Sequence, residues 1–189
     1  MWRQLRPAAV VLLVMTALTG LVYPLVVTGV GQGLLPHQAN GSLIWRDGRA
    51  VGSELIGQSF DDPRYFWGRL SATSPPYNAA ASSGSNQGPM SPALAESAKA
   101  RLEALRKADP GNAAPVPVDL ATSSGSGLDP HIGLKNAFLQ ARRVAPARGI
   151  GTEALEKIIR AHTEGRDLGI FGEPRVNVLR LNLALDKKM

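Results

Sequence analysis

The chain has 189 residues and lacks cysteine entirely. Disulfide bonds, thiolate metal sites and cysteine nucleophiles are therefore excluded, while an oxidising compartment is permitted without being indicated. Aromatic residues are also scarce, at 5% of the sequence, so a folded core must rely mainly on Leu, Val, Ile and Ala. These absences describe a modest domain held by aliphatic packing rather than by covalent cross-links.

Recognisable catalytic and metal-binding motifs are missing as well. His37, His131 and His162 do not have metal-ligand spacing. Ser124 and Ser126 share letters with a Gly-x-Ser-x-Gly nucleophile elbow but lack its hydrophobic strand-to-helix setting. The net charge is +6, yet the basic residues are scattered singly without interleaved aromatics, which argues against a nucleic-acid partner. We expect no enzyme activity, no metal site and no nucleic acid.

Charge is also absent from the run Ala8–Val30. As a helix, this run would reach roughly 35 Å at about 1.5 Å per residue, enough to cross a hydrocarbon core of about 30 Å. Backbone groups in lipid must pair within the segment, so we expect a transmembrane helix over residues 8–30. Pro24 can kink it. Gly20 and Gly29 mark places where a partner helix can approach, although small residues are common in such helices.

The arginines around this run predict its orientation. Arg3 and Arg6 precede it, and the next charged residue is Arg46. The positive-inside rule then places residues 1–7 in the cytoplasm and residues 31–189, a single domain, on the extracytoplasmic side. A cleaved secretory signal is the competing interpretation, but the run is longer than a usual signal core and no Ala-x-Ala site follows it.

The first part of the predicted domain contains a hairpin and an aromatic cluster. Asp47 and Gly48 separate two short extended runs, and this pair suits a two-residue turn that needs positive φ at both positions. Trp45 and Val51 are expected on the buried face of the hairpin. Four of the ten aromatic residues fall within residues 60–67, which predicts a core patch or an interface.

Three helices and two strands complete the prediction. The helices begin at Pro92, at Asp129 as N-cap and at Thr152, and they end at residues 109–111, 146–149 and 165. Arg101 is expected to face water. Residues 116–122 and 176–185 read as strands, the second because its leucines alternate with polar residues. The fold class is therefore an α+β domain, with a mixed sheet and about three helices, tethered by one transmembrane helix.

Two stretches are rich in small polar residues. Residues 70–92 have the composition of a flexible linker, although Asn and Gly also suit an ordered functional loop. Residues 122–130 would cradle an anion if their free amides met a helix N-terminus. That segment lacks the lysine of a Walker A loop and Pro130 removes one donor, so a structural turn is favoured and a partner-contact loop is the third alternative.

Several sequence blocks, in order along the chain, share a pattern with one family. The blocks are residues 23–29 with Gln32, 38–44, 55–60, 65–69, 77–78, 83–86, 126–132 and 176–186. Together they resemble the C subunits of the bacterial high-affinity potassium-transporting ATPases, the KdpC family. Gln87 and residues 133–136 depart from the family's usual residues, which affects local loop detail.

The resemblance implies a non-catalytic accessory subunit of an ATP-driven potassium uptake complex in the bacterial inner membrane. The implied partners are a potassium-channel-like subunit, a P-type ATPase subunit, a small single-span subunit and the lipid bilayer. The chain would be needed for assembly and activity, and residues 77–89 become an ordered contact surface rather than a linker. The candidate contact residues are Gly20, Pro24, Gly29, Tyr77, Asn78, Ser85, Asn86 and Asp129.

The family is also described as a catalytic chaperone that binds ATP and raises the ATP affinity of the hydrolysing subunit. Gln32 is then the candidate nucleotide contact, and ATP is the one cofactor to consider. The predicted topology conflicts with this role, because ATP is cytoplasmic and Gln32 follows the span on the other side. The preferred hypothesis is a structural and gating subunit, whose domain caps the potassium entrance and whose helix clamps the complex.

Overall fold

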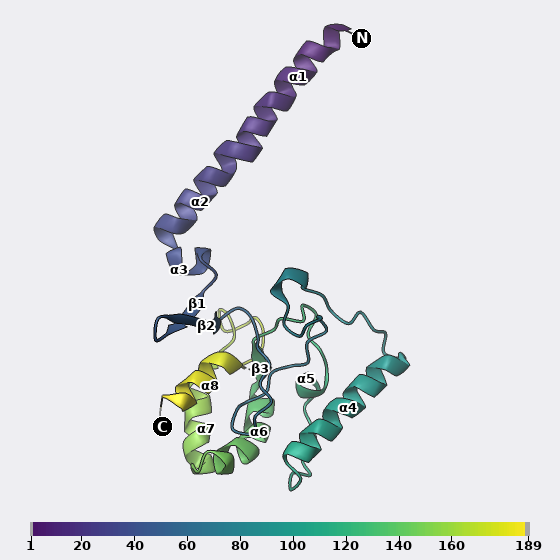
Figure 1. Ribbon diagram of the computed structural model, residues 1–189, viewed down its shortest axis with the longest axis vertical. Helices are drawn as coiled ribbons and strands as arrows, with labels where there is room; N and C mark the ends of the chain where they lie inside the picture. The colour runs from purple at the N-terminus through teal and green to yellow at the C-terminus, as the bar shows by residue number, and fades with distance from the viewer. Residues whose placement is uncertain (1, 188–189) are drawn as a thin grey trace.

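A long apolar helix and a separate α+β domain make up the structure, a computed structural model whose described residues are 2–187. The helix runs from Trp2 to Leu34 and is long and apolar enough to cross a membrane. Figure 1 shows it as a rod that leaves the domain at one end. The predicted apolar N-terminal helix is confirmed, and it extends beyond residues 8–30 in both directions.

Pro24 changes the hydrogen bonding of this rod without ending it. Helix α1 (Trp2–Ala17) passes into a π-helical turn η1 (Leu18–Val22), and α2 (Tyr23–Leu34) continues from there. Proline has no N–H for the carbonyl four residues earlier, and a π turn lets a wider ring of the backbone pair instead. In this turn the Tyr23 N–H donates to the Leu18 carbonyl.

A short helix and a hairpin connect the rod to the domain. Helix α3 (Pro36–Ala39) is followed by strands β1 (Leu43–Arg46) and β2 (Arg49–Ser53), which pair antiparallel. Asp47 and Gly48 have φ values of 50° and 73°. Because an Asp-Gly pair tolerates these left-handed conformations, the predicted hairpin turn is confirmed.

The predicted buried face of the hairpin is wrong. The register shifts between Ile44 and Trp45, so that Trp45 pairs with Ala50 rather than with Val51. A shift of this kind re-aims the side chains that follow it. Trp45 is consequently 64% exposed.

The main core lies where a small sheet meets three helices. Strands β3 (His131–Gly133), β5 (Arg175–Asn177) and β4 (Thr163–Glu164) form the sheet in that order, with β5 in the middle and both pairings antiparallel. The named strand pairs of the described residues are all antiparallel, so the predicted mixed sheet is wrong. Leu70 and Ser123 form an isolated parallel bridge outside these sheets.

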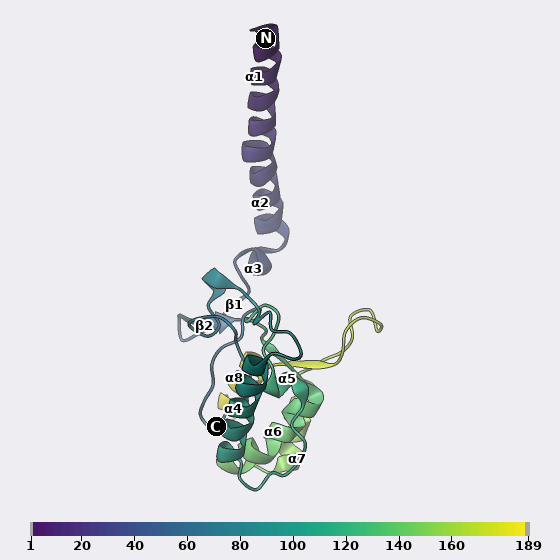
Figure 2. The same ribbon diagram turned by 90° about the vertical axis from the view of Figure 1, so that its right-hand side faces the viewer.

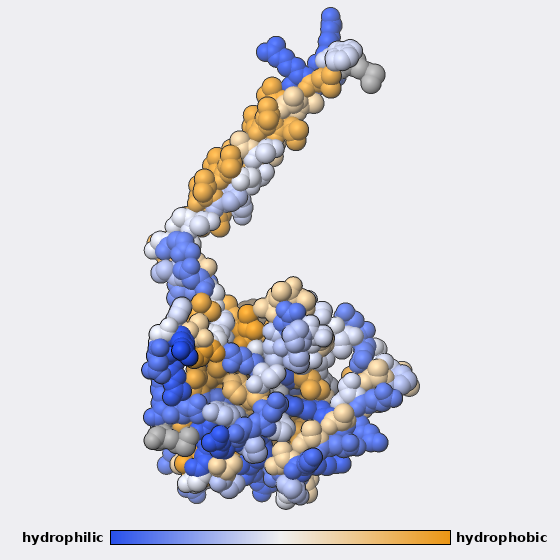
Figure 3. Space-filling model, in the orientation of Figure 1, coloured by the Kyte–Doolittle hydropathy of each residue, from blue (hydrophilic) through white to orange (hydrophobic). Residues whose placement is uncertain are grey.

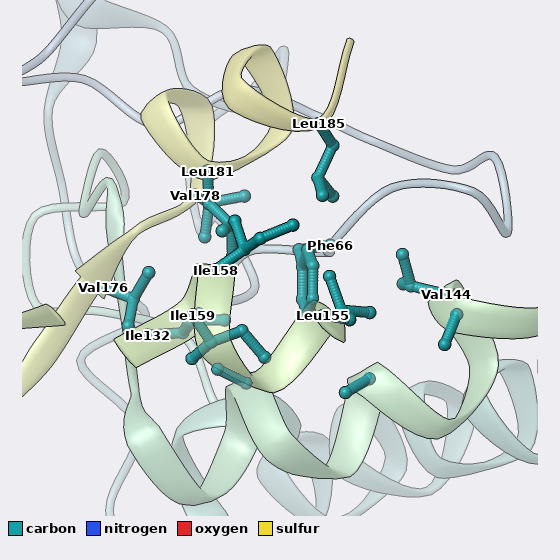
Figure 4. Packing of buried hydrophobic residues seen from close by; sticks show 13 residues of the cluster. Phe66, Ile132, Val144, Leu155, Ile158, Ile159, Val176, Val178, Leu181 and Leu185 are labelled. Carbon is teal, nitrogen blue, oxygen red and sulfur yellow. The ribbon is translucent and has the colours of Figure 1, made fainter. Parts of the chain in front are cut away.

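Helices α6 (Leu134–Ala147), α7 (Thr152–Ala161) and α8 (Val178–Asp186) pack with this sheet around Phe66. Figure 4 shows their aliphatic side chains converging on the Phe66 ring. The buried members of this cluster are aliphatic apart from that ring, and the partly buried Phe60 and Phe138 pack against them. Its buried members are Phe66, Ile132, Ala137, Ala141, Val144, Ala145, Leu155, Ile158, Ile159, Val176, Val178, Leu181 and Leu185.

The predicted strand over residues 176–185 is wrong beyond its first residues. The segment is β5 followed by α8, and Asn177 caps the helix by accepting a hydrogen bond from the Arg180 N–H at 3.1 Å. Val178, Leu181 and Leu185 lie three and four residues apart and enter the core together. Leucines at every second position fit the period of a strand as well as the helical spacing fits a helix. Packing against the rest of the core decided in favour of the helix.

A second cluster packs α4 (Pro92–Ala108) and the four-residue α5 (Val118–Ala121) on Trp67, through Leu105 and Leu120. The helix predicted from Pro92 is confirmed. The strand predicted over residues 116–122 is wrong, because Pro117 starts α5 and turns Leu120 into this cluster.

The prediction that Arg101 faces water is wrong, because its side chain points inward. Its guanidinium lies 5.3 Å from the Trp67 ring centroid and donates to the carbonyls of Gly68 and Leu120 at 2.8 and 3.1 Å. Burial lowers its pKa. Arg101 is therefore a bridge between α4 and the segments beneath it.

The second and third predicted helices exist with different boundaries. Helix α6 begins at Leu134, so Asp129 is not its N-cap, and β3 lies between the two. It runs through Pro146 and ends one residue later. Helix α7 begins at Thr152 as predicted but ends at Ala161, before Gly165.

Candidate partner-contact surface

The buried amide side chains of Asn182 and Gln140 hold residues 66–67, the segment that leads into the candidate partner-contact surface. The Phe66 N–H donates to Asn182 Oδ1 at 2.9 Å, and Asn182 Nδ2 donates back to the Phe66 carbonyl at 3.0 Å. Gln140 pairs in the same way with the N–H and carbonyl of Trp67, at 2.8 and 2.9 Å. Side chains from α8 and α6 thus replace the neighbouring strands that an extended segment normally requires.

The Tyr77 side chain packs against the segment that follows, at Gly68 and Arg69. A Cβ at Gly57 would lie 2.5 Å from the Tyr77 ring, and one at Gly68 would lie 2.8 Å from its hydroxyl, so only glycine leaves room for the ring. The hydroxyl donates to the Arg69 carbonyl at 2.6 Å. Burial raises the pKa of Tyr77, which keeps this donor protonated. The Tyr77 side chain is therefore a wedge inside the loop.

Asp129 joins the same network through Arg69. The Arg69 guanidinium donates to the Asp129 carboxylate at 3.1 Å and to the Ser123 carbonyl at 3.0 Å. Burial by itself would raise the pKa of Asp129, but hydrogen bonds from His131 and Arg69 outweigh it and leave this pKa below its ordinary value. Asp129 also accepts from the His131 N–H at 2.9 Å. Asp129 and Tyr77, distant in sequence, thus meet at Arg69.

The polar stretch after Leu70 is ordered by its own hydroxyls. Ser71 Oγ accepts from the Tyr77 N–H at 2.8 Å and donates to the Gly127 carbonyl at 2.7 Å. Thr73 Oγ1 accepts from the Asn78 N–H at 2.9 Å. Asn78 in turn caps the 3₁₀ turn η2 (Ala79–Ala81). These bonds make residues 71–81 an ordered loop, and the linker interpretation is wrong.

The loop continues against the glycine- and serine-rich stretch 123–127. The Ser83 N–H and the Ser82 hydroxyl both donate to the Ser126 carbonyl at 3.0 Å. The two backbones touch at Gly84, where a Cβ would lie 2.8 Å from the Gly125 carbonyl oxygen. Ser85 and Asn86 follow on the exposed side of this contact. We call this ordered stretch, residues 71–86, the contact loop, and Ser85 and Asn86 lie at its exposed end.

Ser85 borders a groove of about 670 Å³ between this loop and α4. Its walls are mostly Ala, Ser and Gly, which lets another chain approach the backbone closely and supplies no group suited to general acid–base work. Figure 3 shows the pale surface of this loop beside α4. The lining residues are Leu70, Ser71, Ala72, Gly84, Ser85, Gln87, Leu94, Ser97, Ala100, Arg101, Ala104, Ala121, Thr122 and Ser123.

The anion cradle considered for residues 122–130 is wrong. No helix starts at Pro130, because α6 begins at Leu134. The Ser124 N–H donates to the Leu70 carbonyl, and the Leu128 N–H donates to Ser126 Oγ. The stretch packs behind the contact loop, and its Ser126 and Gly127 carbonyls accept hydrogen bonds from that loop.

Gln32 lies at the domain end of the rod and pairs with Asn40. Gln32 Nε2 donates to Asn40 Oδ1 at 3.2 Å, and Asn40 Nδ2 donates to Gln32 Oε1 at 3.0 Å. Both groups are exposed. This pair braces α2 against the end of α3, so a nucleotide contact would have to displace it.

The remaining candidates lie on the rod itself. A Cβ added at Gly20 or Gly29 would meet no described atom within 4 Å, and Pro24 is the second residue of α2, just after the π turn. The structure therefore divides the sequence candidates into rod positions, the Gln32 brace and the contact loop together with Asp129, which joins that loop through Arg69. Sequence reasoning missed Arg69, Gln140 and Asn182, whose importance depends on partners far away in the sequence.

Comparisons with known proteins agree on one family. The family model KdpC, K+-transporting ATPase c chain, matches residues 5–187. A Sorangium cellulosum protein named "Potassium-transporting ATPase KdpC subunit" is 64% identical over 187 residues, which is 98% of each chain. Proteins of the same name from Methylococcus capsulatus and Burkholderia ambifaria are 63% and 60% identical, over 96% of this chain and 96% and 95% of theirs.

Proposed function

The chain belongs to the KdpC family, the C chains of K+-transporting ATPases, and on this basis we propose that it is a non-catalytic accessory subunit. It assembles with an ion-conducting subunit, an ATP-hydrolysing subunit and a small single-span subunit in the inner membrane. Its helix clamps these partners, and its domain caps the potassium entrance on the extracytoplasmic side. The complex needs it for assembly and activity.

The observation that carries this proposal is the exposure of the apolar side chains of the rod. None of the residues described for α1, η1 and α2 is buried. A helix this apolar requires lipid or other protein helices around it. Gly20 and Pro24, four residues apart, share a face of the rod, whereas Gly29 lies about half a turn away at roughly 100° per residue. The rod thus offers small residues to partners on two sides.

The connection between rod and domain supports the capping role. The Leu35 and Ala39 N–H groups continue the helical hydrogen bonds past the end of α2, and the Ser42 N–H donates to the His37 carbonyl at 2.9 Å. The Glu54 N–H then donates to the Ser42 carbonyl at 3.0 Å. A hydrogen-bonded connection of this kind holds the domain near the membrane face instead of letting it diffuse on a tether.

The charge pattern supports the extracytoplasmic placement of the domain. Arg3 and Arg6 lie at the free end of the rod, and the positive-inside rule puts that end in the cytoplasm. A nucleotide role for Gln32 gains nothing from the geometry, because its amide is paired with Asn40 and lies at the domain end of the rod.

Co-purification of the complex tests the proposal. A tagged chain should retain the other subunits, and Gly20→Ile or Gly29→Ile should lower their yield because a branched side chain blocks close helix approach. Leu21→Ile, which keeps the volume and adds the same β-branch, is the matched control and should leave the yield unchanged. Wild-type yields for both glycine variants would show that the rod is only an anchor and would overturn its clamping role.

A further inference from the structure

A narrow hairpin loop stands out from the domain between β4 and β5. We call residues 165–174 the finger. Its two arms are joined by reciprocal backbone hydrogen bonds of 2.9 Å between Asp167 and Phe171, and the Gly169 N–H donates to the Arg166 carbonyl at 3.1 Å. Figure 2 shows the finger projecting sideways from the domain, across the line of the apolar rod rather than along it. It is a braced projection.

The tip of the finger is apolar and exposed. Leu168, Ile170 and Phe171 are 88%, 72% and 63% exposed. Three large apolar side chains gathered on one projection form the kind of patch that marks an interaction site. They contribute nothing to the two core clusters of the described residues, so packing within the domain does not explain them.

The backbone at the tip strengthens this argument. Leu168 has a φ of 54°, a left-handed conformation that glycine or asparagine adopts at lower cost than a bulky residue. A turn selected only for shape would have a polar or glycine residue here. The left-handed backbone of Leu168 destabilises the free domain, and no contact within the domain offsets this cost. A contact between Leu168 and another protein would offset it.

The base of the finger carries no excess of positive charge. Arg166 pairs with Glu173 at 2.8 Å, and Arg175, at the start of β5, pairs with Glu164 at 3.2 Å and with Asp167 at 3.4 Å. These two arginines therefore face three carboxylates. An apolar tip above such a base lacks the excess of cations that attracts an anionic membrane surface, and its sideways direction points along the membrane plane.

We propose that the finger docks its tip, Leu168 to Phe171, into an apolar pocket on the extracytoplasmic surface of another subunit of the same complex, beside the rod. This inference rests on the proposed function, because it needs the domain outside and the complex assembled. The finger gives the domain a second attachment at a distance from the rod, so that the cap is fixed at two points and cannot pivot about the rod alone.

The absence of cysteine makes a direct test possible. Leu168→Cys in the full-length chain should react with a maleimide at least about tenfold more slowly in the assembled complex than in the isolated chain in detergent. Lys107→Cys, exposed on the last turn of α4, is the matched control and should react alike in both. A photoreactive maleimide attached at position 168 should yield an adduct with another subunit, identified by mass.

Leu168→Asn separates binding from folding. Asparagine suits the left-handed backbone, so the unfolding midpoint of the isolated chain should stay equal or rise while binding to the other subunits weakens about tenfold. Equal maleimide reactivity of the Leu168→Cys variant in both states, or adducts only with lipid or a second copy, would overturn the proposal while the wild-type chain still co-purifies. Failure of the wild-type chain to co-purify would overturn the proposed function first.

Discussion

Replacing Asn182 by leucine tests whether side-chain amides really substitute for strand pairing in this fold. Asn182 is 1% exposed, and it satisfies both the N–H and the carbonyl of Phe66, which is fully buried at the centre of the core. Leucine has the same branched arrangement of side-chain heavy atoms, and its two methyl groups are bulkier than the amide, so the substitution creates no cavity. It removes both hydrogen bonds and leaves two buried polar groups without partners.

The expected loss of stability follows from those two groups. Each buried orphan costs about 1–3 kcal/mol, which gives about 2–6 kcal/mol together, and the added apolar burial returns about 1 kcal/mol. We expect the free energy of unfolding to fall by about 3 kcal/mol. Because domains of this size are stable by about 5–15 kcal/mol, the variant should still fold but unfold at clearly lower denaturant.

Urea unfolding of the full-length chain in detergent measures this loss. Trp67 directly follows Phe66, so its fluorescence reports on the affected segment, with Trp2 and Trp45 replaced by phenylalanine in every variant. Asn112→Leu is the control, because the Asn112 amide bonds to Asp109 at 2.9 Å in a surface loop and should cost about 1 kcal/mol or less. Equal midpoints for both variants would refute the reasoning.

Further predictions concern the contact loop and the rod end. Gly57→Ala should destabilise the domain by about 1–3 kcal/mol, since its Cβ would overlap the Tyr77 ring, and thermal unfolding against Gly111→Ala, which has open space, checks this. The pKa of Asp129 is depressed on folding, so its contribution is present above its unfolded value of about 4 and is lost as pH falls through the lower folded value. Asp129→Asn should therefore flatten the dependence of stability on pH below about 4; an unchanged acid limb would contradict this. Gln32→Ala should leave both co-purification and the ATP dependence of potassium-stimulated hydrolysis unchanged, and a raised KM for ATP would revive the nucleotide role.

Features with a local cause could be predicted from the sequence. The Asp47-Gly48 turn needs nothing beyond two residues that accept positive φ, and Ser91 with Pro92 marks a helix start without reference to the rest of the chain. The rod is predicted by uninterrupted apolar length. In each case the determining interaction lies within a few residues.

Features decided by distant contacts could not be predicted. Residues 178–185 satisfied both periods, and only the neighbouring helices and Phe66 made the helix the better choice. Arg101 had the spacing of a solvent-facing residue, and Trp67 and the Gly68 carbonyl turned it inward. The contact loop has a linker's composition, and its order depends on distant contacts such as the hydrogen bond from Ser71 to the Gly127 carbonyl, 56 positions away.

The central claim is that the domain lies on the extracytoplasmic side of the membrane, whereas ATP is on the cytoplasmic side. A single-cysteine labelling experiment tests this claim most directly. Ser83→Cys, at an exposed loop position, should react with a membrane-impermeant maleimide in intact cells, while Gln4→Cys, at the other end of the rod, should react only after lysis. A denatured sample controls for burial of either site in the complex. Labelling of the Ser83→Cys variant from outside is the predicted result. Labelling of that variant only after lysis, with the Gln4→Cys variant labelled in intact cells, would contradict the account.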